Sequence, residues 1–482
     1  MNFFAKWIII KNEDDGKMAN EMLIGFGWLS FALLIGAFLR YKITFLQNML
    51  IPSSAIGGIV GFILINIGII QVPIDLFQTF VAQLLIISFI SIGLTGTSSH
   101  NNSEGNTNVG KTITKGVIWF AVAWGLFVNM QALLGMLAIK GFNLFGGAMD
   151  VMYGILLPFG FAMGTGQAIT YGAVAEGHGL QDAASIAITF AVIGYILATF
   201  VGIPLAKFGI RKGLASRSEP LSEDLLKGVT PKEGRERLGE LTFHSSNMET
   251  LAFHLAMIGG VYLIASYSVD WISQILPSNM ASFVVGSLFI FGILWGMIVS
   301  VTSKKLKINH LFSSDLQKSI TGWTVDFMIV ASFMSISLDA IQQYFVPIML
   351  ITLIGGIVTT IVCFYVGQRM GSNYDFERSV AFYGLATGQV PNSLLLLRIV
   401  DPRFRTPPIL ELAIYNSLLP LTITQIFLGI APIVWGWSEG TAMLFFGGSM
   451  IVYLILFKVF GIWGPKTYSM FGKPVASTDE QS

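Results

Sequence analysis

The sequence predicts an all-α polytopic membrane protein with two inverted five-helix repeats, each carrying a re-entrant hairpin, plus one extra C-terminal transmembrane helix. Only 11% of the 482 residues are charged and 54% are hydrophobic, whereas soluble domains have about 25% charged residues. Apolar segments of roughly 20 residues, the length that spans a bilayer, recur along the whole chain. Two further apolar stretches are interrupted near their middles by the same three residues, Thr-Gly-Gln.

The apolar segments divide the chain into two repeats with flanking parts. In order, these are an interfacial N-terminal segment at 1–19, repeat 1 at 20–206, a cytoplasmic linker at 207–248, repeat 2 at 249–432, an extra transmembrane helix at 433–465 and a cytoplasmic tail at 466–482. The eleven spans are expected at 20–39, 52–71, 76–96, 114–139, 183–206, 249–268, 280–301, 319–342, 346–367, 409–432 and 441–461.

The interrupted stretches lie at about 149–177 and 376–398. Glycine beside threonine and glutamine disfavours a continuous helix, and each half of these stretches is too short to cross a bilayer. We therefore expect two re-entrant hairpins that enter the membrane and return to the same side. A helix break inside a membrane is tolerated where protein or a water-filled cavity satisfies the freed backbone groups, as at transporter substrate sites.

Three sequence markers recur in the same order in both halves, which predicts the repeat. They are Ile51-Pro52-Ser53 with Leu276-Pro277-Ser278, Ser88-Phe89-Ile90-Ser91 with Ser332-Phe333-Met334-Ser335, and Thr165-Gly166-Gln167 with Thr387-Gly388-Gln389. Each repeat has an odd number of spans. The second copy must therefore lie upside down in the membrane relative to the first.

Lys and Arg collect on cytoplasmic loops and so predict the orientation. The linker at 207–248 is rich in both residues, and further basic residues flank the predicted cytoplasmic ends of the spans. The predicted outer loops near 72–75, 269–279 and 343–345 contain neither residue, and Lys140 is the exception. We expect a multi-pass protein of the cell (inner) membrane with its N-terminus outside and its C-terminus in the cytoplasm. The first hairpin then enters from outside and the second from inside.

Several functional classes are disfavoured by the sequence. The single cysteine, Cys363, excludes an intramolecular disulfide and a cysteine-based metal cage. No basic stretch with interleaved aromatic residues suggests nucleic acid. Glu176 and His178 alone are too few for a metal site. The sequence shows no Ser-His-Asp set, phosphate-binding glycine loop or paired carboxylates, so an enzyme is not expected, and an intramembrane enzyme is a minor alternative.

The candidate binding residues gather at the two breaks. A broken helix offers unpaired N–H groups at one end, suited to a carboxylate, and unpaired carbonyls at the other, suited to sodium. Threonine, glutamine, asparagine and serine add side-chain donors and acceptors. The candidates are Gly164, Thr165, Gly166, Gln167, Thr387, Gly388, Gln389, Asn392 and Ser393. The alternative is that both breaks are packing kinks.

Polar residues inside the predicted spans are further candidates. Gln131 and Asn416 are candidates for direct binding, or they bond neighbouring helices. Asp326 is either a cation ligand or a side chain that extends to the membrane interface. Glu411, near the start of its span, is expected at the interface, and Arg398 is expected to be a cytoplasmic arginine rather than a substrate ligand.

Several short stretches resemble one known family. They include Ile51-Pro52 with Gly57-Gly58, Ser91 to Leu94, Met130-Gln131, Gly164-Thr165-Gly166, Thr189-Phe190 with Gly202-Ile203-Pro204, and Gly384-Leu385 with Pro391. The most specific is Met370-Gly371-Ser372-Asn373-Tyr374-Asp375. Over about residues 20–432 the chain resembles the bacterial sodium/glutamate symporters. It departs from them at Phe161-Ala162-Met163-Gly164, where a double glycine is usual, and in its extra span.

The resemblance implies two inverted repeats, a homodimer, and a transport unit that moves against a fixed scaffold. It also implies sodium-coupled symport of glutamate or a related small carboxylate, with transported Na⁺ as the coupling ion and no other cofactor. The expected partners are thus the carboxylate, Na⁺, the lipid bilayer and a second copy of the chain. Two alternatives stay open: a proton-coupled organic-anion transporter with Asp326 as the carrier, and a non-transporting membrane scaffold or sensor.

Overall fold

A computed structural model describes most of the chain. The described residues are 13–95, 107–216, 226–229, 239–244, 246–277, 281, 284–402, 405–417 and 419–470. Within them all regular secondary structure is helical. The expected loop at 97–113, the tail and parts of the linker fall largely outside these ranges, as does most of the segment at 1–19.

The helices follow the predicted order. The first half contains α1 (Glu13–Lys42), α2 (Thr44–Asn48), α3 (Ser53–Asn66), α4 (Ile74–Thr95), α5 (Thr107–Leu144), η2 (Val151–Ile155), α6 (Leu156–Phe161), α7 (Thr165–Gly177), α8 (Ala183–Leu197), η3 (Ala198–Gly202) and α9 (Ile203–Arg211). The second contains α11 (Thr250–Ile275), α13 (Leu288–Lys305), η5 (Asn309–Leu311), α14 (Ser314–Met334), α15 (Leu338–Gln343), α16 (Phe345–Gly367), α17 (Asp375–Val400), α18 (Pro408–Ser417), α19 (Leu419–Val434) and α20 (Glu439–Val459).

Nine helices of the described residues are long and apolar enough to cross a membrane, which supports a multi-pass protein. Several boundaries differ from the sequence prediction, those of α1, α3 and α14 among them. α3 has only 14 residues, and α1 begins at Glu13, inside the expected interfacial segment. α14 stops at Met334 instead of continuing to residue 342, since Ser332 and Ser335 hydroxyls donate to backbone carbonyls within and at the end of this helix.

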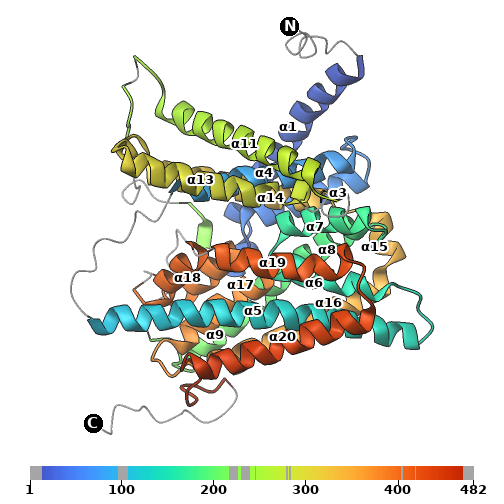
Figure 1. Cartoon of the computed structure of the whole chain (residues 1–482), viewed down its shortest axis with the longest axis vertical. Helices are drawn as coiled ribbons and strands as arrows, with labels where there is room; N and C mark the ends of the chain where they lie inside the picture. Colours follow the sequence, from blue (N-terminus) through green and yellow to red (C-terminus); the bar gives the residue numbers. More distant parts are fainter. Residues whose placement is uncertain are drawn as a thin grey trace.

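The helices form two groups that lie side by side (Figure 1). One group contains α1, α3, α4, α11, α13 and α14, in which α4 packs against α13 and α14, and α14 packs against α3. The other contains α5, α6, α8, α9 and α16 to α20, and α7 lies at the border. Glycines bring helices of the first group close together: an added Cβ at Gly93 would lie 2.6 Å from the carbonyl oxygen of Ile293.

The chain reverses direction inside both interrupted stretches. Ser393 Oγ donates to the carbonyl of Ala381 over 2.6 Å, although a straight helix would hold residues twelve apart about 18 Å from each other. Phe159 and Tyr171, also twelve apart, have ring centroids 4.8 Å apart. α17 therefore folds back on itself although its length and composition alone would suffice to cross a membrane. We call residues 151–177 the first hairpin and α17 the second hairpin.

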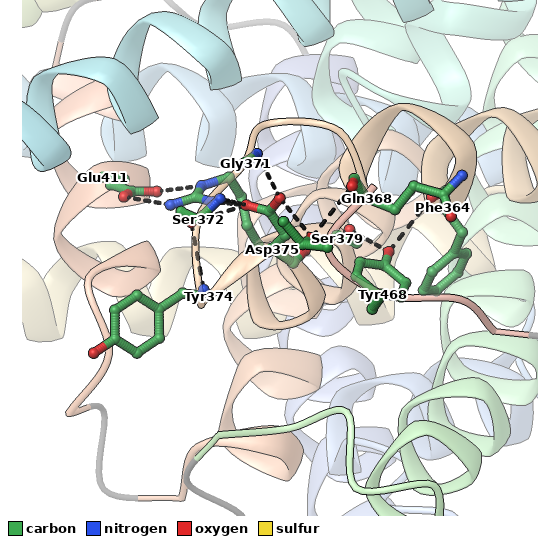
Figure 2. Close-up of polar contacts among 11 residues, drawn as sticks. Phe364, Gln368, Gly371, Ser372, Tyr374, Asp375, Ser379, Glu411 and Tyr468 are labelled. Atoms are coloured by element: carbon green, nitrogen blue, oxygen red, sulfur yellow. Dashed lines mark hydrogen bonds and ion pairs between the residues drawn. The ribbon is translucent and has the colours of Figure 1, made fainter. Parts of the chain in front are cut away.

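A buried ion network fixes the start of the second hairpin (Figure 2). Arg378 donates to both carboxylate oxygens of Glu411 on α18, over 2.7 and 2.8 Å, and to Asp375 over 2.8 Å. All three side chains are at most 1% exposed. The expectation that Glu411 is interfacial is therefore wrong: its partner lies 33 residues earlier, and only the fold brings the two together.

This network yields a stability prediction. Replacing Arg378 with methionine leaves Glu411 as a buried charge without its cation, which typically costs about 3–5 kcal/mol. We expect Arg378→Met to lower the thermal unfolding midpoint of the purified protein strongly and Arg378→Met/Glu411→Leu to recover part of the loss. Arg398→Met, at an exposed arginine of the same helix, is the matched control. A double variant no more stable than Arg378→Met would contradict this role of the pair.

Candidate functional site

The breaks of the two hairpins share an unusual backbone conformation. In the first, α6 ends at Phe161 and α7 begins at Thr165, with Gly164 at φ 90° and ψ −173°. In the second, Gly388 leaves the helix and Gln389 has φ 69° and ψ −177°. This region is almost restricted to glycine, and another residue there stores about 1–3 kcal/mol of strain. Gln389 is therefore a strained residue, and it occupies the place in the second hairpin that Gly164 occupies in the first.

The two Thr-Gly-Gln sequences do not occupy equivalent places in the hairpins. Thr165 is the first residue of α7 and follows the first break. Thr387 belongs to the arm before the second break, where its hydroxyl donates to the carbonyl of Tyr383. The conformational equivalent of Gly164 is Gln389, so the sequence copies are offset by three residues from the structural ones.

The two breaks meet each other. A Cβ added at Gly164 would lie 1.4 Å from Nε2 of Gln389, so the glutamine amide packs directly on the glycine. Thr165, Gly388 and Gln389 line one small cavity of about 10 Å³. That volume holds about one water molecule. The space between the breaks is therefore nearly closed in this conformation.

Unpaired buried polar atoms gather around the breaks. Thr165 Oγ1, both amide atoms of Asn392 and Oε1 of Gln131 are buried with no hydrogen-bond partner among the described residues. Leaving a buried polar group unpaired costs about 1–3 kcal/mol. Asn392 Nδ2 also lies over Gly388, 2.0 Å from where a Cβ would be. These atoms offer hydroxyl and amide groups to a polar ligand or a cation.

Other predicted residues support the hairpins. Gln131 on α5 donates through Nε2 to the carbonyl of Ala386 over 2.9 Å and to Thr359 on α16. Ser393 closes the second hairpin through its bond to Ala381. Gly166 faces Leu85 of α4 rather than the cavity, and Gln167 is buried on α7.

Two further candidates are Asp326 and Asn416, and Asp326 is not among the residues that line the cavity. Asp326 is exposed on α14 beside the Ser54 hydroxyl of α3. Tyr195 on α8 lines the cavity between the breaks. Asn416 lies near the end of α18, and its side chain is outside the described part of the structure.

Sequence reasoning missed the contribution of α8. Its continuation into η3 is a π-helical turn at Ala198–Gly202, and the Cβ of Ala198 would lie 3.0 Å from one added at Gly388. Pro204 is the available signal, because proline has no N–H for the carbonyl four residues earlier. Such turns occur often at functional sites. The hydroxyl of Tyr195 is also buried without a partner in the described residues.

The fold and the helix breaks together indicate a class of membrane protein. A multi-pass helical protein in which two broken helices meet at unpaired polar groups has the architecture of a secondary transporter. The family model described as sodium/glutamate symporter matches residues 22–406. The chain therefore belongs to the sodium/glutamate symporter family, which supports sodium-coupled symport. Comparisons with curated proteins and with solved structures found no match.

The contact between the breaks predicts that a methyl group added at Gly164 disturbs transport. Gly164→Ala places a Cβ on the Gln389 amide and puts alanine at a φ of 90°, which costs about 1–3 kcal/mol from backbone strain alone. We expect loss of sodium-driven uptake while folded protein is still obtained. Gly177→Ala, at the far end of α7 where an added Cβ meets nothing within 4 Å, should transport normally. Normal uptake by Gly164→Ala would place the site elsewhere.

Proposed function

We propose that this protein couples sodium entry to the uptake of glutamate or a related small carboxylate, with both bound between the two helix breaks. The observation that carries the proposal is the gathering of unpaired polar atoms where the breaks meet, namely those of Thr165, Asn392 and Gln131. Family membership supports the sodium and glutamate assignments. The proposed binding residues remain the candidates named from the sequence, with Thr165, Gln389 and Asn392 as the central ones.

Each break supplies both kinds of helix end. The N-terminal end of α7 at Thr165 and the arm after Gln389 carry partial positive charge, about +0.5 for a full helix, which suits a carboxylate. The carbonyl ends before each break carry the opposite charge. With the oxygens of Thr165 and Asn392 they suit sodium, a hard cation that takes oxygen ligands. The opposed hairpins thus bring substrate and ion sites together.

Release and capture of substrate require movement, because the cavity between the breaks holds about one water. We propose alternating access in which the group with α5, the hairpins and α16 to α20 moves, elevator-like, against the group with α1, α4 and α14. The contacts at this border include Gly166 against Leu85 and the edge-on rings of Tyr195 and Phe333. Apolar contacts of this kind can slide without exposing buried charge.

Inverted repeats, opposed re-entrant hairpins and a homodimer are part of the same proposal. The packing supports the repeats. In the predicted repeats α3 corresponds to α13 and α4 to α14, and the contact of α4 with α13 is matched by the contact of α14 with α3. The proposed orientation is N-terminus outside and C-terminus cytoplasmic. Figure 1 supports a common side for the predicted cytoplasmic ends: the start of α5, the start of α18 and the end of α20 lie on its left.

The decisive experiment is uptake by purified protein in sealed vesicles. Labelled glutamate should accumulate with an inward sodium gradient and not with a potassium gradient of the same size. Asn392→Ala, which removes both unpaired amide atoms, should raise the half-saturating glutamate or sodium concentration about tenfold. Uptake driven by a proton gradient alone would favour the carrier role of Asp326. Absence of uptake and of ligand binding for glutamate and related carboxylates would favour a scaffold or sensor.

The orientation is tested at the two ends of α11. Single cysteines at the exposed positions Ser246 and Gln274, in a background with Cys363→Ala, should react with an impermeant reagent from opposite sides of intact cells. We expect Gln274→Cys to label from outside and Ser246→Cys only after the cells are opened. Labelling of Ser246→Cys from outside would contradict the proposed orientation.

A further inference from the structure

The segment that follows α20 returns to the second hairpin. We call residues 463–470 the C-terminal strap. Thr467 donates its backbone N–H to the carbonyl of Gln368 over 2.9 Å and its hydroxyl to Asp375 over 2.8 Å. Tyr468 donates its hydroxyl to Ser379 Oγ over 2.6 Å, as Figure 2 shows. The strap thus bonds to two residues one turn apart on the first arm of the second hairpin.

The strap is held firmly in place. The Tyr468 ring is 5% exposed and meets Phe376 edge-on, with centroids 5.5 Å apart. Arg369 lies with its guanidinium 5.4 Å from the Trp463 ring and 4.7 Å from the Tyr365 ring. Lys212 at the end of α9 donates to the carbonyl of Met470 over 3.0 Å. Burial raises the pKa of Tyr468 well above its ordinary value, so its hydroxyl stays protonated and donates.

Both bonds of the strap join the ion network. Asp375 accepts a hydrogen bond from Arg378 on one carboxylate oxygen and from the Thr467 hydroxyl on the other. Ser379, which receives Tyr468, donates in turn to the carbonyl of Asp375 over 2.6 Å. Successive hydrogen bonds of this kind strengthen one another in a buried setting. The strap therefore acts on the same helical turn that anchors the hairpin to α18.

The strap lies outside the part of the chain that the family model matches, which ends at residue 406. The bonds of Thr467 to Asp375 and of Tyr468 to Ser379 fall within that part, near the beginning of the arm that ends at Gly388. From Asp375 to Thr387 this arm is a continuous helix, so a displacement at its base moves Gly388 and Gln389.

We propose that Thr467 and Tyr468 are positioning residues for transport: they fix the first arm of the second hairpin and so set the place of Gly388 and Gln389 in the binding site. This inference rests on the proposed function for its effect on substrate and sodium. The contact with the arm itself can be tested without transport.

The test removes single hydroxyls from the full-length protein. Tyr468→Phe keeps the ring packing and loses the bond to Ser379, and Thr467→Val keeps the side-chain shape and loses the bond to Asp375. We expect each to raise the half-saturating concentration of glutamate or sodium about two- to tenfold, with the maximal rate per folded protein retained. Thr467→Ser should restore wild-type values. Tyr267→Phe, on a ring of α11 that is 71% exposed, is the control.

A second measurement does not depend on transport. Amide hydrogen exchange of residues 375–387 should be about two- to tenfold faster in Tyr468→Phe than in wild type, with Tyr267→Phe unchanged. Wild-type half-saturation in both strap variants, or a loss of folded protein with unchanged half-saturation, would overturn the positioning role. If the wild-type protein takes up no substrate, the proposed function fails. Independently of uptake, unchanged amide hydrogen exchange in Tyr468→Phe would overturn the contact of the strap with the arm.

Discussion

The structure depends on one constraint: a helix that breaks inside an apolar protein must find partners for the groups it frees. Two carbonyls of the second hairpin have side-chain partners. Gln131 bonds the carbonyl of Ala386 just before the second break, and Ser393 bonds that of Ala381 across the hairpin. The side-chain atoms that remain unpaired in the described residues around the breaks include those of Thr165, Asn392, Gln131 and Tyr195. These unpaired side-chain atoms mark the place where the two hairpins meet as the candidate site.

The sequence was sufficient for the class, the family and the approximate hairpin positions, because these follow from composition, length and glycine placement. It could not place the breaks to the residue. The sequence predicts Thr-Gly-Gln as the break in both hairpins. In the second hairpin the residue with positive φ, Gln389, belongs to this sequence, but in the first it is Gly164, which directly precedes it. Local sequence allows several break points, and contact between the hairpins selects one. That contact is made by residues more than 200 positions apart.

Long-range pairing explains the error at Glu411, and the early end of α14 has a local cause. Glu411 resembles an interfacial acid when only its own helix is considered, and its buried state becomes comprehensible only beside Arg378. The early end of α14 at Met334 has no glycine or proline to announce it. Serine hydroxyls that bond nearby carbonyls slightly destabilise a helix. Whether the helix ends there depends on its tertiary packing. Such cases lie beyond what a single sequence can specify.

The two hairpins are anchored by different physical means, and this difference bears on how the site can open. At the first hairpin Asp150 caps the N–H of Met152, and Glu176 accepts from the N–H of Ala184. These bonds are near the surface and local. The base of the second hairpin is held by charges that are at most 1% exposed, and breaking such a pair costs about 3–5 kcal/mol.

The break of the second hairpin is held less firmly than its base, because Gln389 already stores about 1–3 kcal/mol of backbone strain. Moving the base of the second hairpin therefore costs more than moving its tip, where a change in backbone angles relieves strain. Opening of the closed cavity is then expected to begin at Gln389 and at the first hairpin, with the base of α17 moving as one body with α16 and α18.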